Sequence, residues 1–433
     1  MSSHGFMLAA PASGSGKTVL TLALIRALRS LGANVRPAKA GPDYIDPMFH
    51  ALAAGRSSVN LDGWAMRPDL VRTLASEGDP FVVEAAMGLF DGASDGSGTA
   101  ADLAAMLELP VVLVLDAART SQSLGAVLRG FVTNDPRIRI AGTVVNRVAS
   151  ERHATMIRAA VAPVCEELGL QLLGMIPRHD DLVLPSRHLG LVPAGEHKGI
   201  EDFVQRAADL VLKAIDVNAL ANLERKEVSG GVTDGLPVLG TRIAIANDIA
   251  CSFTYRHILD DWHRAGASLH PFSPLADEAP DEVADAVFLP GGFPELHAGR
   301  LATATCFRSG IRRAVDRGAW VYGECGGYMT LGNALIDADG CSHEMLGLLP
   351  LVTSFEKRRL HLGYRMMTFL QGTPFGPVGA VVRGHEFHHS TIIEEGPIES
   401  LFSVKDASGI ALDRAGLMRG RVFGSYMHMI DRT

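Results

Sequence analysis

A glycine-rich stretch near the start of the chain has the residue types and spacing of a phosphate-binding loop. The stretch Ala10-Pro-Ala-Ser-Gly-Ser-Gly-Lys-Thr18 follows an apolar run and precedes a helix-length segment. In such a turn, successive backbone N–H groups point at one anion at the positive end of a helix. Lys17 would reach the β and γ phosphates of a nucleotide, and the Thr18 hydroxyl would bind Mg²⁺. The loop residues expected around the phosphates are Ser13, Gly14, Ser15 and Gly16.

One position departs from the usual motif, because Pro11 stands where a P-loop normally begins with glycine. The Gly-Lys-Thr end is intact, so we expect a variant P-loop. A Gly/Ser turn that only caps a helix is the alternative, and the strand, turn and helix context argues against it.

Three acidic residues stand at or just beyond the ends of strand-like runs: Asp46, Glu84 and Asp116. Mg²⁺ prefers hard oxygen ligands and usually takes one or two carboxylates beside the nucleotide phosphates. Acids at the carboxyl ends of parallel strands point into the ligand crevice of such sheets. The sequence therefore predicts a Mg²⁺ site near the P-loop, and the residues alone leave open which of the three acids serve it.

A second chemical centre is expected at Gly323-Glu-Cys-Gly-Gly-Tyr328, which follows a strand-like run. Small residues permit a strained strand-to-helix turn that exposes the central side chain, so this stretch has the form of a nucleophile elbow. Cys325 would then lie at the N-terminus of the next helix, where the helix dipole favours thiolate. A nucleophilic cysteine is the expected chemistry.

Two further segments could complete the cysteine site. Leu289-Pro-Gly-Gly-Phe293 is a flexible loop, and the N–H groups of Gly292 and Gly326 are the expected oxyanion donors. His428 near the C-terminus is the expected base. A lone cysteine is usually a small buried hydrophobe, but the elbow, the glycine loop and the late histidine occur in an order that favours catalysis.

The histidine-rich stretch His385-Glu-Phe-His-His389 raises the alternative of a metal site. Imidazole and carboxylate groups are common metal ligands. The stretch is expected to be a strand or a loop, and we favour a structural role near the cysteine site or the domain interface.

The elements that must position these residues alternate along the first half. Helix-length segments separate apolar strand-like runs, which predicts a parallel sheet covered on both faces. The expected strands are Gly5–Ala10, Phe81–Ala85, Val111–Asp116, Ile138–Val145 and Gln171–Ile176, and the expected helices are Thr18–Leu31, Ser121–Phe131 and Glu151–Leu168.

The alternation breaks in a polar, glycine-containing stretch and then starts again. We therefore expect a P-loop domain over residues 1–217, a linker over 218–240 and a second α/β domain over 241–433. Strands of the second domain are expected at Arg242–Asn247, Ala286–Leu289 and Trp320–Tyr322.

Bulk properties narrow the class of partner. The 433 residues carry a formal net charge of −8 and no run of Lys and Arg, which argues against nucleic acid or an anionic membrane. No apolar run reaches the roughly 20 residues of a membrane span, and the N-terminus has no basic region typical of a secretory signal. The five cysteines are scattered, as in a reducing compartment. We expect a cytoplasmic protein.

The whole sequence resembles the a,c-diamide synthases of corrin biosynthesis, which act on cobyrinic or hydrogenobyrinic acid. The resemblance covers essentially the full length. Its most specific pieces are Ala10–Thr18, Gly41–Pro47, Val83–Gly92, Pro185–Pro193, Leu289–Phe293, Gly323–Tyr328, Arg383–Ser390 and Gly424–His428.

This resemblance implies a dethiobiotin-synthetase-like P-loop domain, followed by a flavodoxin-like class I (triad-type) glutamine amidotransferase domain. It implies that ATP phosphorylates a carboxylate of the corrin macrocycle, while glutamine hydrolysis at Cys325 supplies ammonia. Glu84 and Asp46, together with Thr18, would hold Mg²⁺, and Asn146 would lie at the adenine base. The macrocycle carboxylate would be met by Tyr44, Ile45, Asp46 and Asp91.

One feature departs from the common triad. Many triad amidotransferases carry His-x-Glu, in which the acid orients the imidazole, but Ile430 occupies that position here. A missing orienting group should weaken the base by leaving its tautomer unfixed. The third partner of His428 therefore stays unnamed at this point.

Rival interpretations remain. Cobyric acid synthase and a nickel-sirohydrochlorin a,c-diamide synthase share this two-domain plan. A rival of another class is a P-loop regulatory ATPase with an inactive glutaminase-like module, although such a module has no need of Cys325 and His428. The sequence leaves open whether the corrin contains cobalt. It also leaves the oligomeric state open, with a homodimer as one possibility.

Overall fold

The computed structural model describes residues 3–76, 80–187, 190–231 and 234–433. It divides into two compact units, Met1–Thr233 and Asp234–Thr433, here called unit 1 and unit 2.

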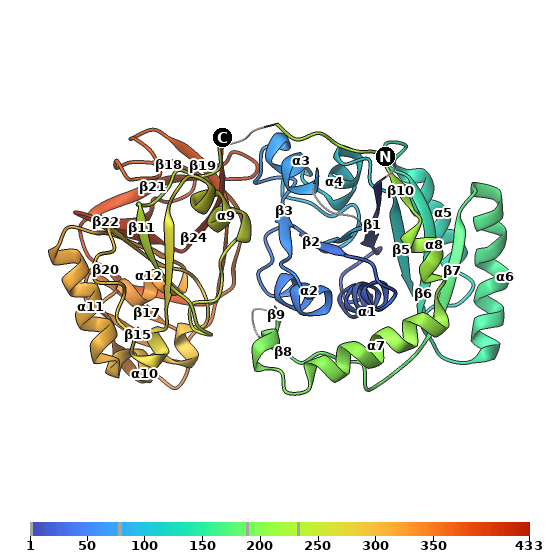
Figure 1. Cartoon of the computed structure of the whole chain (residues 1–433), viewed down its shortest axis with the longest axis horizontal. Coiled ribbons are helices and arrows are strands. Elements are labelled where there is room, and N and C mark those ends of the chain that lie inside the picture. Colours follow the sequence, from blue (N-terminus) through green and yellow to red (C-terminus); the bar gives the residue numbers. More distant parts are fainter. Residues whose placement is uncertain (1–2, 77–79, 188–189, 232–233) are drawn as a thin grey trace. The chain divides into compact units, whose positions relative to one another are not determined.

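Unit 1 is built on a parallel sheet in the order β3-β2-β4-β1-β5-β6-β7 (Figure 1). Its central strands are continuous apolar runs with both faces buried, as expected of a sheet covered by helices. The strands are β1 (Ser3–Ala9), β2 (Arg36–Ala40), β3 (Val59–Leu61), β4 (Phe81–Glu84), β5 (Val111–Asp116), β6 (Ile140–Val148) and β7 (Gln171–Pro177).

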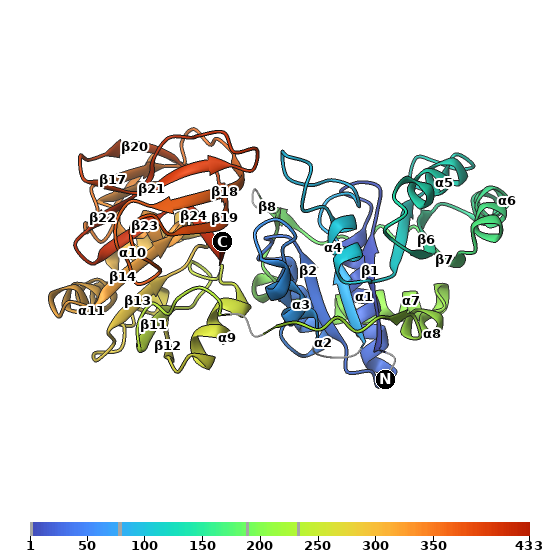
Figure 2. The same ribbon diagram turned by 90° about the horizontal axis from the view of Figure 1, so that it is seen from above.

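Helices cover both faces of this sheet. Figure 2 shows α5 (Leu124–Asn134) and α6 (Glu151–Leu168) on one side of β6 and β7, and α7 (Ile200–Ala214) and α8 (Val217–Ala221) on the other. Helix α1 (Lys17–Ser30) packs against α7 and against α2 (Asp46–Ala54). The remaining helices are α3 (Pro68–Ser76) and α4 (Ala100–Met106). The strands and helices expected for this half are confirmed, with ends that differ by a few residues.

The stretch expected as a linker over 218–240 starts inside unit 1. It begins within α8 and continues into β10 (Glu224–Arg225), which pairs antiparallel with β1. Arg225 is buried, donates to the Ala75 carbonyl oxygen at 3.1 Å and lies 5.1 Å from the Phe81 ring centroid. A single buried arginine therefore anchors this polar segment, which is too short to show a period. Residues 226–231 and 234–241 contain no helix or strand.

Unit 2 contains a mixed sheet in the order β12-β11-β13-β14-β23-β22-β21-β18-β19-β24. The first five strands pair parallel and the rest pair antiparallel, so the parallel sheet expected for this domain makes up one half of a larger one. The parallel strands are β11 (Arg242–Ala246), β12 (Ser268–Phe272), β13 (Ala286–Leu289), β14 (Trp320–Glu324) and β23 (Val422–Ser425). The antiparallel strands are β18 (His361–Phe369), β19 (Val381–His388), β21 (Glu399–Asp406), β22 (Ala415–Arg419) and β24 (Met427–Arg432).

A smaller sheet and four helices complete unit 2. The sheet has the order β16-β15-β17-β20, with β15 (Ala334–Ile336), β16 (Ser342–Glu344), β17 (Leu351–Ser354) and β20 (Thr391–Glu395). The helices are α9 (Arg256–Arg264), α10 (Ala298–Thr303), α11 (Thr305–Asp316) and α12 (Gly326–Leu331). The core joins β13 and β14 to α11 and α12 through fully buried Leu289, Val321, Ile311 and Leu331. The short α12 is thereby fixed directly behind β14.

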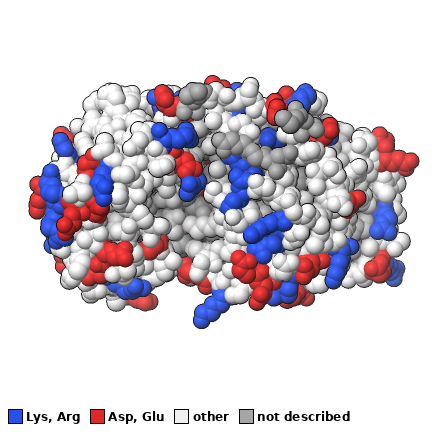
Figure 3. All heavy atoms as spheres, in the orientation of Figure 1, with Lys and Arg blue, Asp and Glu red and all other residues white. Residues whose placement is uncertain are grey.

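The sequence argued against nucleic acid and membranes as partners, and two features of the structure concern this point: the surface charge and the length of the helices. On the face shown in Figure 3, acidic and basic side chains are interspersed over both units. Among the described residues, every helix is too short or too polar to cross a bilayer.

Candidate active sites

The phosphate loop lies between β1 and α1 and depends on two glycines. Gly14 and Gly16 adopt φ of +77° and +85°, a region that L-residues with side chains rarely enter. A Cβ atom on Gly16 would lie 2.4 Å from Asn146 Nδ2, so glycine is also required sterically. Ser13 is exposed at the tip of the loop, whereas buried Ser15 donates from Oγ to the Ala12 carbonyl oxygen at 2.9 Å.

Lys17 is buried and already held at this loop. Its Nζ donates to the carbonyl oxygen of Met87 at 2.6 Å and to that of Ala12 at 3.1 Å. Burial lowers the pKa of Lys17, and nearby Glu84 opposes that change. The ammonium is therefore positioned at the loop by neutral acceptors, which a phosphate oxygen could replace.

The carboxylates expected at the metal meet beside Thr18. Its Oγ1 donates to Glu84 Oε1 at 2.7 Å and lies 3.5 Å from Asp46 Oδ2. Both acids are buried, Glu84 at the end of β4 and Asp46 at the start of α2. These three oxygen ligands form a donor set that fits Mg²⁺. Asp116, the third acid considered, instead pairs with Arg147 at 2.8 Å.

Two basic residues in this cluster were missed from the sequence. Lys39 Nζ lies 2.5 Å from Asp46 Oδ2 and 2.8 Å from Glu84 Oε1, and His50 Nε2 lies 2.7 Å from Glu84 Oε2. Lys39 is the fourth residue of β2 and His50 lies on α2. The sequence offered no clear signal for Lys39, because β2 reads Arg36-Pro-Ala-Lys-Ala40 and shows no apolar strand pattern.

These contacts set the charge of the cluster. Burial raises the pKa of Asp46 to about 8, although Lys39 opposes this. Burial also disfavours charge on Glu84, but Lys39 and the hydrogen bond from His50 outweigh it and lower the pKa of Glu84. Burial would lower the pKa of Lys39, yet the two carboxylates raise it above its ordinary value. Lys39 is thus the internal counter-charge of the pair.

The residues expected around the macrocycle carboxylate lie on two loops. Tyr44 and Ile45 are buried next to Asp46, and the backbone N–H of Ile45 donates to Asp43 Oδ1 at 2.8 Å. Asp91 is exposed, and its Oδ2 accepts a hydrogen bond from the Gly88 N–H at 2.8 Å. The Asp91 loop approaches the phosphate loop, since a Cβ atom on Gly88 would lie 2.6 Å from the Pro11 carbonyl oxygen.

Asn146, the residue expected at the adenine base, borders a pocket beside α1. Its Nδ2 donates to the Ser15 carbonyl oxygen at 3.0 Å. The pocket is lined mainly by apolar side chains, among them Val19, Leu20 and Ile176, with Arg147 at its edge. An apolar cleft next to the phosphate loop is suited to a flat base.

In unit 2, Cys325 lies at the strained junction of β14 and α12. Its φ of +46° and ψ of −103° are unusual for a residue with a side chain, as expected at a nucleophile elbow. Small neighbours make the turn sterically feasible, since a Cβ atom on Gly327 would lie 1.8 Å from the Leu289 carbonyl oxygen. The sequence-based prediction of this turn is confirmed.

The two expected oxyanion donors lie close to each other. A Cβ atom on Gly326 would lie 3.1 Å from the Gly292 backbone nitrogen, so the two backbones nearly touch. The Gly326 N–H also forms a hydrogen bond to the Cys325 sulfur. Two backbone donors at one nucleophile fit the role of an oxyanion hole.

His428 borders the same small space as the cysteine. A Cβ atom placed on Gly291 would lie 3.3 Å from Cys325 Cβ, 2.6 Å from His428 Cε1 and 3.4 Å from His428 Nε2. The ring of His385 stacks on that of His428 with centroids 5.1 Å apart, and the Tyr255 hydroxyl lies 3.2 Å from His385 Nδ1. The imidazole is therefore enclosed, and its Cε1 and Nε2 atoms lie on the side of Gly291, next to Cys325.

The electrostatics at Cys325 differ from the sequence-based expectation of a thiolate. Burial raises the pKa of the Cys325 thiol above its ordinary value, and Glu295, Glu324 and Glu386 act in the same direction. The hydrogen bond from the Gly326 N–H opposes them only in part. A short helix N-terminus does not outweigh burial and nearby acids, so the resting thiol is protonated and needs a base.

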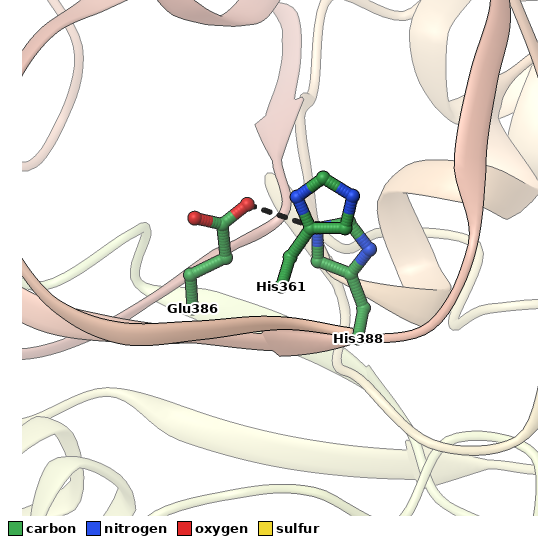
Figure 4. A group of neighbouring side chains, drawn as sticks. All are labelled: His361, Glu386 and His388. Carbon is green, nitrogen blue, oxygen red and sulfur yellow. Dashed lines mark hydrogen bonds and ion pairs between the residues drawn. The ribbon is translucent and has the colours of Figure 1, made fainter. Parts of the chain in front are cut away.

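The histidine-rich stretch lies on β19, next to this site. His388 Nε2 lies 2.9 Å from Glu386 Oε1 (Figure 4). Arg365 binds the other carboxylate oxygen of Glu386 at 2.8 Å. The ligand atoms of His361, Glu386 and His388 all lie within 4.8 Å of one another. The two imidazole rings are parallel and stacked, with centroids 4.6 Å apart, so one ion cannot lie in both ring planes. This geometry favours a hydrogen-bonded packing cluster over a metal centre.

Comparison with known proteins finds a matching family model in each unit. Residues 6–192 match the CobQ/CobB/MinD/ParA nucleotide binding domain, and residues 242–432 match the CobB/CobQ-like glutamine amidotransferase domain. The chain is 52% identical to "Hydrogenobyrinate a,c-diamide synthase" of Sinorhizobium sp, over 99% of this chain and 98% of that one. It is 52% identical to the Brucella abortus protein of that name over the same shares, and 50% identical to the Rhodobacter capsulatus one over 98% of each. The chain therefore belongs to the family of the hydrogenobyrinate a,c-diamide synthases.

Proposed function

We propose that this enzyme uses ATP and glutamine to convert the a and c carboxylates of a corrin macrocycle, hydrogenobyrinic acid or its cobalt-containing counterpart cobyrinic acid, into amides. The observation that carries the proposal is the full-length identity of 50–52% to proteins named for this reaction. The variant phosphate loop in unit 1 and the cysteine elbow in unit 2 support it.

Unit 1 would activate the carboxylate. A substrate carboxylate oxygen attacks the γ phosphorus of ATP, which breaks the bond to ADP and leaves an acyl phosphate. Ammonia then attacks the acyl carbon, the amide forms, and inorganic phosphate leaves. Such transfers depend on positioning and charge stabilisation more than on covalent chemistry by the protein. Lys17 and the N–H groups of the loop would supply that charge.

Thr18, Asp46 and Glu84 would hold Mg²⁺, because their oxygens already meet within hydrogen-bonding range. When bound, the cation neutralises and orients the β and γ phosphates. Lys39 contacts the same two oxygens, Asp46 Oδ2 and Glu84 Oε1, and would remain their counter-charge.

The remaining roles in unit 1 follow from position. Asn146 and its apolar pocket would receive the adenine base. Tyr44, Ile45, Asp46 and Asp91 would line the site of the macrocycle carboxylate, with Asp91 on the exposed loop nearest Pro11.

Unit 2 would produce the ammonia. His428 takes the proton of the Cys325 thiol, and the sulfur attacks the side-chain amide carbon of glutamine. The N–H groups of Gly292 and Gly326 stabilise the resulting oxyanion. The proton passes from His428 to the departing nitrogen, leaving a glutamyl thioester that water hydrolyses to glutamate.

The test is a product count by mass spectrometry. The full chain is incubated with ATP and glutamine, or with ATP and ammonium, and with either hydrogenobyrinic or cobyrinic acid. Two amides added to one of these macrocycles support the proposal. Four amides added elsewhere on the ring would point to cobyric acid synthesis, and no amide with either nitrogen source would overturn an amidating role. A homodimer and a cytoplasmic location stay predictions from the sequence.

A further inference from the structure

The glutaminase site lacks the acid that usually follows its histidine by two residues. That position is Ile430, a buried apolar residue on β24. A general base works through one ring nitrogen only if the other nitrogen carries the proton, and a carboxylate usually fixes that tautomer. Some other group must therefore face Nδ1 of His428.

Glu324 occupies that place from a different strand. It is the last residue of β14, directly before Cys325, and its Oε2 lies 3.5 Å from His428 Nδ1. The Glu324 and His428 side chains are 6% and 1% exposed, so water does not screen this pair.

The other oxygen of Glu324 is anchored by two donors. Oε1 accepts from the Tyr322 hydroxyl at 2.6 Å and from the Met429 backbone N–H at 3.2 Å. Met429 follows His428 on β24, so the carboxylate is tied to the backbone of the very strand that carries the base. This anchoring leaves Oε2 as the oxygen that faces the imidazole.

We propose that Glu324 is the positioning carboxylate of the glutaminase site, holding Nδ1 of His428 so that Nε2 serves Cys325. The elbow then contributes both the nucleophile and the residue that orients its base. This inference rests on the proposed roles of Cys325 and His428, and it replaces the missing His-x-Glu acid with a residue 104 positions upstream of His428.

The experiment compares Glu324→Gln, Glu324→Asp and wild type in the full chain, with glutamine or ammonium as nitrogen donor. For Glu324→Gln we expect the glutamine-dependent kcat to fall by about 10²–10⁴-fold, with the KM for glutamine within about threefold. The ammonium-dependent rate should stay within about twofold. Glu324→Asp should recover part of the lost rate, because it keeps the charge at greater distance.

The pH profile separates positioning from a merely structural role. Glu324 is one of the acids that raise the pKa of Cys325, so Glu324→Gln should shift the glutamine kcat/KM profile to lower pH. The other titratable groups around this pair are Tyr322, which donates to Glu324, His385, which stacks on His428, and Glu295, Glu386 and Tyr426 near the sulfur. These stay unchanged. Glu344→Gln, an exposed carboxylate on β16, is the matched control and should alter neither rate nor profile.

Two outcomes would overturn the inference. One is a Glu324→Gln enzyme that keeps at least half of the glutamine-dependent kcat. The other is a large loss with an unshifted profile and no recovery in Glu324→Asp, which would mark Glu324 as structural. Failure of the proposed function would look different, since wild type would then form no amide with either nitrogen donor.

Discussion

The two sites of this chain bury acidic groups in opposite ways. In unit 1, Asp46 and Glu84 share one lysine, Lys39, and every charge has a partner within 2.8 Å. In unit 2, Glu295, Glu324 and Glu386 all raise the pKa of the Cys325 thiol, even though Glu386 itself pairs with Arg365. One cluster is balanced before its substrate arrives, and the other is biased against the charge its nucleophile needs.

This difference follows from what each site must do. A site for ATP receives a large negative charge, and buried carboxylates without a counter-charge would repel it. A site for a neutral amide needs a thiolate only during the reaction, so a protonated resting thiol protects the cysteine from wasteful chemistry. The comparison predicts that the two sites fail in different ways when one side chain is removed.

The largest expected effect is at the nucleophile. Cys325→Ala removes the only atom that can form the thioester, so glutamine-dependent amidation should fall by at least about 10⁴-fold. Ammonium-dependent amidation should stay within about twofold, because unit 1 is untouched. Steady-state assays with each nitrogen donor measure this, and loss of both activities would break the assignment of separate sites.

Lys17→Ala should give the complementary pattern. Removing one preorganised cation from a phosphoryl-transfer site costs about 10²–10³-fold in rate. Both nitrogen donors should be affected equally, since the acyl phosphate is common to both routes. Product assays at saturating ammonium test this, and an undiminished rate would remove Lys17 from the chemistry.

The central residues of both sites could be predicted from the sequence. The phosphate loop, Thr18 and Glu84 could be predicted because they stand at strand and helix ends, where local pattern and function coincide. Cys325 and His428 could be predicted in the same way from the elbow and the late histidine. In each case the reactive residue belongs to a short local motif that can be recognised without knowing the fold.

The partners of these residues could not be predicted, because they are contacts between elements distant in sequence. Lys39 and His50 meet Glu84 only when β2, β4 and α2 come together. Glu324 meets His428 only because β23 pairs with β14 and leads directly into β24. The antiparallel half of the unit 2 sheet was missed for the same reason, since strand order is not visible in local periodicity.

Lys39→Met should lower the free energy of unfolding substantially. It removes the ammonium that Asp46 and Glu84 share, and breaking such a buried pair costs about 3–5 kcal/mol of unfolding free energy. Chemical denaturation of the full chain, following the transition that belongs to unit 1, measures the loss. Lys226→Met, at an exposed lysine paired with Glu108, is the matched control and should change stability by about 0.5 kcal/mol or less.

A second variant sharpens that test. Lys39→Met combined with Glu84→Gln removes one charge of each sign, so the pair should lose less stability than the sum of the single variants. Strict additivity would mean that Lys39 does not act as the counter-charge of Glu84.

The smallest expected effect concerns the thiol at rest. Because burial and three acids hold the Cys325 pKa above its ordinary value, the thiolate fraction should still be rising at pH 9. Alkylation of Cys325 by iodoacetamide, followed by peptide mass spectrometry, should therefore accelerate by about tenfold per pH unit between pH 7 and 9. Exposed Cys306 and Cys341 provide reference peptides in the same sample.

Glu295→Gln removes one of the three acids and should shift the Cys325 curve to lower pH by less than about one unit. A wild-type curve that levels off below pH 8 would show a preformed thiolate, and unit 2 would then be charged before its substrate arrives.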